Sequence, residues 1–174
     1  MLESQQSLDA TKMILDGVLR NPNRAVLDIG AGTGKFGRLL KGKVATITGV
    51  EVWGPYITQY GLNLQYDTII NSNVLDLDDA TLARHKVAIM GDVLEHIKYD
   101  QGKALIDRLK HFMDEIYLSI PISVCIQDGS VQPFEEHVYH WADKEIRYDL
   151  GFKILRYNIN DNALVAIGTF MWKR

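Results

Sequence analysis

The sequence has 174 residues, 47% of them hydrophobic and 24% charged, and this ordinary globular composition and length suit one domain spanning residues 1–174. The formal net charge of −3 argues against a broad basic surface for nucleic acid, and the single cysteine, Cys125, excludes a disulfide within the chain. No apolar run approaches the roughly 18 to 20 residues of a membrane span and no secretory signal is recognisable, so we expect a cytoplasmic monomer or homodimer with no membrane partner.

Apolar, partly β-branched runs alternate with segments of helical periodicity along most of the chain. Apolar residues at helical spacing predict an N-terminal helix within residues 1–20. Strands are predicted at 25–29, 44–52, 68–70, 87–90, 115–120, 152–157 and 164–170, and helices at 35–40, 55–61, 78–84, 99–113 and 142–150. Because the strand runs are nearly continuously apolar, they predict a parallel sheet that helices cover on both faces.

The C-terminal part departs from this alternation. Residues 158–162, Asn-Ile-Asn-Asp-Asn, have turn chemistry and separate two strands too closely for a parallel crossover. The last strand is therefore expected to be antiparallel in a seven-stranded, mostly parallel, doubly wound α/β sheet. Residues 123–141 form the longest segment without a clear period, and they follow the fifth strand, at the edge of the sheet where α/β proteins bind ligands.

A glycine-rich turn follows the first strand. Gly30-Ala31-Gly32-Thr33-Gly34 leads into a helix, and such a loop lets a ligand approach the backbone and the free N–H groups of the helix. A nucleoside triphosphate loop would need Ser or Thr after Gly-Lys, where Phe36 stands. The loop thus predicts a nucleotide-like ligand of another kind.

Two acidic residues narrow the ligand further. Asp28 ends the first strand, where its carboxylate would repel a pyrophosphate but attract an ammonium group. This residue and the terminal hairpin argue against a nicotinamide oxidoreductase. Glu51 closes the second strand, where an acid accepts hydrogen bonds from a ribose diol. The predicted ligand therefore carries both a cation and a nucleoside.

These features, together with Asp92-Val-Leu-Glu95-His96 after the fourth strand, resemble the motifs of class I S-adenosylmethionine-dependent methyltransferases over nearly the whole chain. The resemblance implies a Rossmann-like sheet of order 3-2-1-4-5-7-6 with strand 7 antiparallel. It implies that Glu51 holds the ribose, that Asn73, or else Asp76, accepts a hydrogen bond from adenine, and that Asp92 lies beside the sulfonium. The residues expected to bind the cofactor are Asp28, Gly30, Ala31, Gly32, Gly34, Glu51, Val52, Asn73, Val74 and Asp92.

The sequence says less about the methyl acceptor than about the cofactor. The Asn-Pro-Pro-Tyr type motif of the adenine and glutamine amino-methylating enzymes is absent, and the motif present instead resembles the small-molecule branch that includes the ubiquinone and menaquinone methyltransferases. His137 and His140, in the loop after the fifth strand, are the candidate general bases, because imidazole titrates in the right range. Trp141 is expected either to wall the acceptor or to anchor the core, and Glu135 and Glu136 to be solvated.

The same residues are alternatively candidates for binding a divalent metal ion such as Mg²⁺. Asp92, Glu95 and His96 at positions i, i+3 and i+4 share a face if the segment is helical, and His137 is a candidate fourth ligand. Quinone O-methyltransferases and small-RNA 2′-O-methyltransferases resemble this chain in such a cluster. This chain differs in having Asp at the first position and in lacking the additional domains and basic surface of the RNA enzymes, so nucleic acid is not the expected acceptor.

The resulting expectation is a methyltransferase that moves the methyl group of S-adenosylmethionine to a small-molecule acceptor, most readily on oxygen. Two alternatives stay open at this point. One is a binding module that holds S-adenosylmethionine without turnover, and the other is a metal-dependent 2′-O-methyltransferase acting on RNA. The acceptor site is expected to consist of the N-terminal helix and the loop 123–141.

Overall fold

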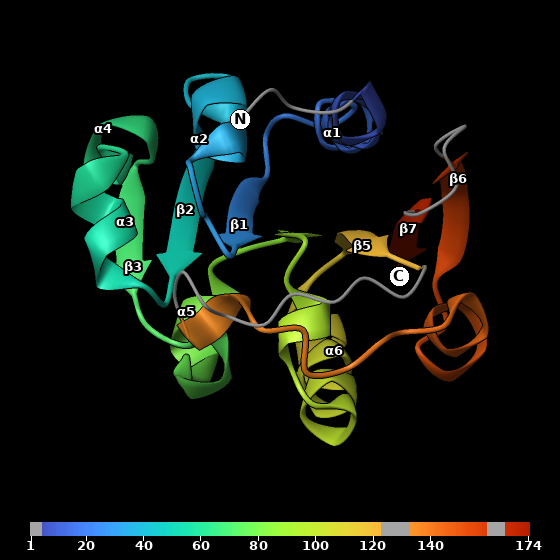
Figure 1. Ribbon diagram of the computed structural model, residues 1–174. Helices are drawn as coiled ribbons and strands as arrows, with labels where there is room; N and C mark the ends of the chain where they lie inside the picture. The colour runs from blue at the N-terminus through green and yellow to red at the C-terminus, as the bar shows by residue number, and fades with distance from the viewer. Residues whose placement is uncertain (1–4, 123–132, 160–165) are drawn as a thin grey trace.

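The computed structural model describes residues 5–122, 133–159 and 166–174 (Figure 1). The helices are α1 (Gln5–Val18), α2 (Lys35–Leu40), α3 (Gly54–Gln59), α4 (Leu62–Gln65), α5 (Asp79–Ala83) and α6 (Tyr99–Phe112). The chain also contains short 3₁₀ turns, η1 (Val74–Asp76), η2 (Leu94–His96) and η3 (Pro133–Glu135), and a π-helical turn, η4 (Glu145–Asp149). The strands are β1 (Ala25–Ile29), β2 (Thr46–Glu51), β3 (Thr68–Asn71), β4 (Val87–Gly91), β5 (Glu115–Pro121), β6 (Lys153–Ile159) and β7 (Ala166–Lys173).

The seven strands form one sheet of order β3-β2-β1-β4-β5-β7-β6. β1 to β5 are parallel, and β7 is antiparallel to both β5 and β6. The predicted fold class and strand order are therefore confirmed. None of the helices in the described ranges is long and apolar enough to span a membrane.

Helices cover both faces of the sheet, so the strands contribute to two apolar cores (Figure 1). In β5, Ile116 and Leu118 belong to the core under α5 and α6, whereas Tyr117 between them belongs to the core under α1 and α2. Successive side chains of a strand point to opposite faces. A strand buried on both faces must therefore be apolar at almost every position, which explains the continuous runs in the sequence.

The predicted elements differ from the observed ones mainly where they are short. The helix α4 was not predicted, and Gly61, with a φ of 60°, separates it from α3. The helix predicted at 142–150 is a short turn whose last part, Glu145–Asp149, is π-helical. The hairpin turn predicted at 158–162 falls largely outside the described residues.

Trp141 anchors the segment before this turn in the core. Its side chain is fully buried, and its indole N–H donates to the carbonyl of Leu94, 2.9 Å away. The ring packs over Gly102 in α6, where an added Cβ would come within 2.7 Å of the ring atom Cζ2. Of the two roles expected for Trp141, the structure shows the core anchor.

Replacing Gly102 by Ala tests this packing. Alanine favours a helix by about 1 kcal/mol over glycine, but its Cβ would force a shift of an indole that is fully buried and hydrogen-bonded. We therefore expect Gly102→Ala to lower the free energy of unfolding by about 1 to 3 kcal/mol, measured by urea denaturation. Gln101→Ala, at the exposed neighbouring position, should change it by less than about 0.5 kcal/mol. A stabilised Gly102→Ala variant would contradict the packing.

Candidate functional site

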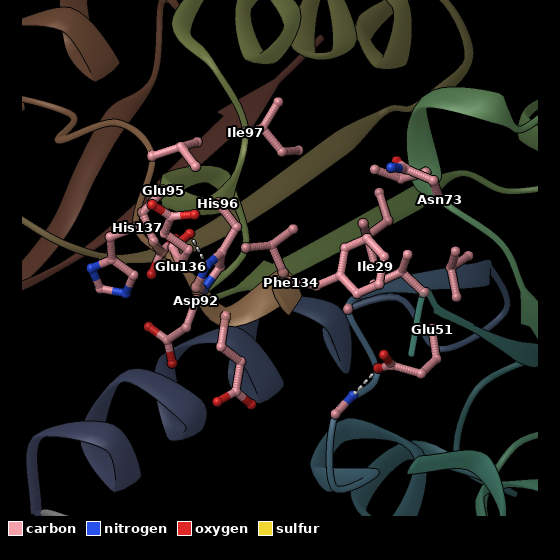
Figure 2. Close-up of a pocket in the computed structure, with 18 of the residues that line it drawn as sticks. Ile29, Glu51, Asn73, Asp92, Glu95, His96, Ile97, Phe134, Glu136 and His137 are labelled. Carbon is pink, nitrogen blue, oxygen red and sulfur yellow. Dashed lines mark hydrogen bonds between the residues drawn. The ribbon is translucent and has the colours of Figure 1, made fainter. Parts of the chain in front are cut away.

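A cavity of about 460 Å³ opens at the carboxyl ends of β1, β2 and β4 (Figure 2). Its volume lies in the range of small-molecule sites. It is lined by Ile29, Gly30, Gly32, Val50, Glu51, Val52, Tyr56, Ser72, Asn73, Val74, Asp92, Val93, Glu95, His96, Ile97, Pro121, Pro133, Phe134, Glu135, Glu136, His137 and Val138. In Figure 2, Phe134 stands between a group around Glu51 and Asn73 and a group around Glu95, His96 and His137.

The glycine-rich loop forms the floor of the first group. Gly30 has a φ of 76°, and a Cβ there would come within 2.4 Å of Val93 Cγ2, so both the backbone and the space require glycine. The N–H groups of Gly30 and Ala31 donate to the carbonyl of Val50, each at 2.9 Å. These hydrogen bonds tie the loop to the end of β2.

Glu51 completes this attachment with its side chain. Its carboxylate accepts hydrogen bonds from the N–H of Gly32 at 2.8 Å and from the N–H of Trp53 at 2.7 Å. The residue is 5% exposed and still lines the cavity. A carboxylate held by two N–H groups keeps further lone pairs, so it remains able to accept hydrogen bonds from a bound diol.

Seven of the residues predicted to bind the cofactor line the cavity, namely Gly30, Gly32, Glu51, Val52, Asn73, Val74 and Asp92. Asp28, Ala31 and Gly34 do not line it. The side chain of Asn73 caps η1, because its Oδ1 accepts from the N–H of Leu75 at 3.0 Å. Asp76, the alternative to Asn73, is exposed and lies outside the cavity lining.

Asp28 is buried behind the loop and is 1% exposed. The hydroxyl of Tyr66 donates to its Oδ2 at 2.6 Å. Burial raises the pKa of Asp28 to about 7, although the hydrogen bond from Tyr66 and the charge of Lys35 act in the opposite direction. Ionisation of Asp28 therefore lowers the free energy of unfolding.

This pKa has a measurable consequence. The folded state holds the Asp28 proton up to about pH 7, whereas the ordinary carboxyl releases it near 3.8, so the stability falls as the pH rises between these values. The free energy of unfolding of Asp28→Asn, minus that of the wild type, should therefore rise by about 2 to 4 kcal/mol between pH 4.5 and pH 8. Urea denaturation at the two pH values measures it. The exposed Asp76→Asn serves as the control, and an unchanged pH dependence in Asp28→Asn would refute the assignment.

The second group of residues begins where β4 ends. Asp92 has a φ of 55°, a left-handed conformation that aspartate tolerates better than most residues, and its N–H donates to the carbonyl of Ser119 at 2.8 Å. The chain then turns through η2, so Glu95 points toward the cavity from a buried position with 2% exposure. Asp92 lines the cavity but is not one of the clustered ligand candidates, which are Glu95, His96 and His137.

Glu95 has neither of its carboxylate oxygens hydrogen-bonded to any of the described residues. Burial, and then the neighbouring charge of Asp92, raises the pKa of Glu95 well above its usual range. A buried carboxylate without a partner is rare in folded proteins, because the desolvation of a charge is costly. The carboxylate of Glu95 thus points to a ligand that would satisfy it.

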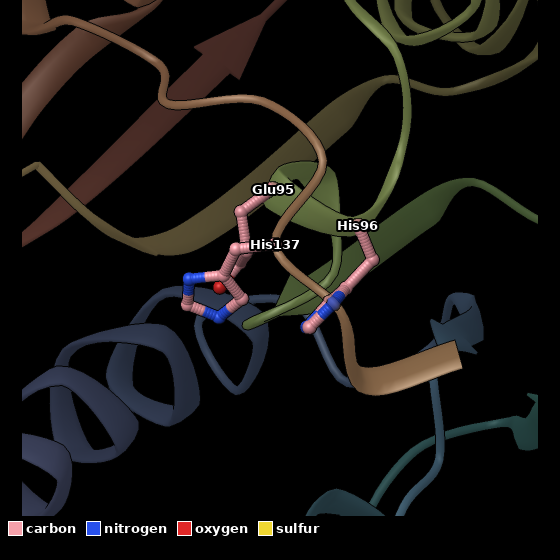
Figure 3. A group of neighbouring side chains, drawn as sticks. All are labelled: Glu95, His96 and His137. Carbon is pink, nitrogen blue, oxygen red and sulfur yellow. The ribbon is translucent and has the colours of Figure 1, made fainter. Parts of the chain in front are cut away.

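Two histidines complete this cluster (Figure 3). The Nδ1 of His96 lies 2.9 Å from the carbonyl oxygen of Glu136, and because a carbonyl only accepts, Nδ1 carries the hydrogen. In neutral His96 the Nε2 is then an acceptor, and burial lowers the pKa of this ring. The ring centroids of His96 and His137 are 4.9 Å apart. One potential ligand atom from each of Glu95, His96 and His137 lies within 4.8 Å of the other two.

The predicted base His140 is exposed and does not line the cavity, whereas His137 does. Glu135, expected to be solvated, instead accepts a hydrogen bond from Tyr56 and lines the cavity. No role for Tyr56 is predicted from the sequence. Nothing local in the sequence relates Tyr56 to Glu135, which follows 79 residues later.

No protein-family model and no curated protein sequence matches this chain. Solved structures do. The magnesium protoporphyrin IX methyltransferase of Synechocystis PCC 6803, with S-adenosylmethionine bound, is 21% identical over 98% of this chain and 79% of that one, with a TM-score of 0.67. The N-terminal domain of EvdMO1, in the presence of S-adenosylhomocysteine and D-fucose, is 17% identical over 99% of this chain and 84% of its own, with a TM-score of 0.71. The chain has the class I methyltransferase fold.

A third structure of this methyltransferase fold is the methyltransferase domain of bacterial CtHen1-CN. It is 21% identical over 97% of this chain and 98% of that one, with a TM-score of 0.63. The sequence resemblance to the methyltransferases is thus confirmed at the level of the fold. In doubly wound sheets ligands bind at the carboxyl ends of the strands, and the cavity of this methyltransferase fold lies at that edge.

Proposed function

We propose that this protein is an S-adenosylmethionine-dependent methyltransferase with a small-molecule acceptor, methylated on oxygen. The observation that carries the proposal is the attachment of the glycine loop to Glu51, which leaves a fixed carboxylate in the cavity beside exposed loop backbone. Glu51 would accept hydrogen bonds from the ribose, and Asn73 would accept one from adenine. Asp92, at the end of β4, would lie beside the sulfonium. The cofactor would then extend from the residues around Glu51 and Asn73 to those at the end of β4.

Binding of S-adenosylhomocysteine tests the cofactor site. Glu51→Ala removes a charged acceptor and frees the N–H groups of Gly32 and Trp53, so we expect it to weaken binding by about 1.5 to 3 kcal/mol, measured by calorimetric titration. Asn73→Ala should weaken binding as well, and Asp76→Ala, outside the cavity, should leave it unchanged. Wild-type affinity in Glu51→Ala would defeat the proposed pocket.

In the proposed reaction an acceptor oxygen attacks the methyl carbon in line with the sulfur. The carbon–sulfur bond breaks with its electron pair staying on sulfur, and the proton of the hydroxyl group leaves to a base. His137 is the proposed base, because it lines the cavity and His140 does not. Phe134 and Val138, both 43% exposed, would contact apolar parts of the acceptor.

His137 has a second candidate role in a divalent metal site. Glu95, His96 and His137 fit such a site, because the carboxylate lacks a partner, His96 presents Nε2, and the donor atoms are close together. A bound ion would lower the pKa of an acceptor hydroxyl and orient it. Carboxylates suit magnesium, while two imidazoles favour manganese or zinc.

The metal proposal predicts a saturable titration. Magnesium, manganese and zinc are titrated into metal-stripped protein saturated with S-adenosylhomocysteine, and at least one should bind. Glu95→Gln and His137→Ala should each weaken binding about tenfold or more, whereas His140→Ala should not, because His140 lies outside the cluster. If no ion binds to the wild type, the metal role is refuted and the base role of His137 stands alone.

The charge of the cavity favours a small acceptor over RNA. Five of its described lining residues are Asp or Glu and none is Lys or Arg, and residues 123–132 contain no Lys or Arg in their sequence. Phosphates are normally bound by basic side chains. Methylation of an RNA 3′ end would therefore overturn this choice of acceptor, and cofactor binding without any transfer would instead favour a binding module.

A further inference from the structure

Residues 133–139, here called the strap, cross the cavity after β5 and contribute six of its lining residues, Pro133, Phe134, Glu135, Glu136, His137 and Val138. The strap contacts both sides of the cavity. One side is formed by α3 and the end of β2, next to the proposed ribose site, and the other by η2, next to Glu95 and His96. The two sides hold the strap in different ways.

The η2 side holds the strap through several contacts. The N–H groups of Val138 and Tyr139 both donate to the carbonyl of Glu95, at 3.0 and 3.1 Å, and the carbonyl of Glu136 accepts from His96. Beyond them Tyr139 packs against Tyr99 and against the buried Trp141, with ring centroids 5.2 and 5.1 Å apart. This end of the strap is therefore part of the packed body of the protein.

The α3 side holds the strap through a hydrogen bond and a ring contact. The hydroxyl of Tyr56 donates to Oε1 of Glu135 at 2.8 Å. Next to it, the ring of Phe134 lies 6.1 Å from that of Trp53, in a tilted arrangement. Both Tyr56 and Glu135 line the cavity, so their hydrogen bond joins the strap to α3 at the cavity itself.

Neither element joined by this hydrogen bond is anchored in the core by a buried side chain of its own. The helix α3 and the turn η3 contain no fully buried residue. Burial and the neighbouring Glu135 raise the pKa of Tyr56 to about 12, so the hydroxyl group keeps its hydrogen and remains a donor at neutral pH. A hydrogen bond from a hydroxyl to a carboxylate is charge-assisted and stronger than a neutral one.

We propose that the Tyr56–Glu135 hydrogen bond closes the α3 side of the cavity over the bound cofactor, which makes Tyr56 and Glu135 positioning residues for cofactor retention. The inference rests on the proposed function, because it needs an adenosyl ligand on Glu51. A ligand there lies between Glu51 and the strap, and its release requires this side to open. The same strap carries His137, but its neighbours Glu136 and Val138 are hydrogen-bonded on the η2 side, so the proposed base keeps its position whether or not the α3 side is closed.

The dissociation rate of S-adenosylhomocysteine tests the proposal. It is measured by stopped-flow displacement for the wild type, Tyr56→Phe, Glu135→Gln and the double variant. Each single substitution should speed release by about threefold to tenfold, because it weakens one hydrogen bond. The double variant should release at nearly the same rate as the singles, since both change the same interaction. Tyr60→Phe, whose ring packs edge-on at 5.0 Å from Tyr56 outside the cavity lining, is the matched control.

Urea denaturation without ligand separates retention from folding, and the variants should unfold like the wild type. Wild-type release rates in Tyr56→Phe and Glu135→Gln would overturn the inference and leave the proposed function intact. Faster release with fully additive effects would also overturn it, because the two side chains would then act independently. Failure of the wild type to bind S-adenosylhomocysteine would overturn the proposed function and this inference with it.

Discussion

The carboxylate of Glu51, held by the N–H groups of Gly32 and Trp53, joins the chain segments that follow β1 and β2. Parallel pairing of these strands brings their carboxyl ends to one edge, but pairing alone does not shape the loops beyond them. The side chain of one residue at the end of β2 supplies what the backbone ladder cannot. It fixes the glycine loop from one direction and the entry to α3, and hence Tyr56, from the other. Both the cavity floor and one of its walls depend on this attachment.

The sheet could be predicted from the sequence because its strands are buried on both faces. Continuous apolar runs such as β4 and β5 leave little ambiguity, and the Asn-rich segment after β6 indicated the antiparallel hairpin. The secondary-structure predictions were wrong where a helical element is too short to produce a periodic pattern in the sequence. Four residues of α4 complete barely one turn, and the π-helical turn at Glu145–Asp149 has no helical pattern long enough to show its geometry.

The site was predictable to the extent that its residues follow strands. Glu51 and Asn73 end or follow β2 and β3, and the topology brings them to the same cavity. Asp92, Glu95 and His96 would share a face only in a helix, but the positive φ of Asp92 precedes a 3₁₀ turn. Of the four candidate ligands, Glu95, His96 and His137 lie together. Contacts between distant segments, such as Tyr56 with Glu135, have no local signal at all.

The position of β7 between β5 and β6 has a consequence for how the chain folds. β5 can pair with β4 early, but its other edge stays open until the seventh strand in chain order arrives and inserts in the opposite direction. Three residues of β5, namely Ile116, Leu118 and Ile120, are buried in the finished sheet. Until the insertion, the apolar strand β5 is an open edge that is free to pair with another molecule. Folding speed and aggregation are thus coupled through the last strand rather than through the binding site.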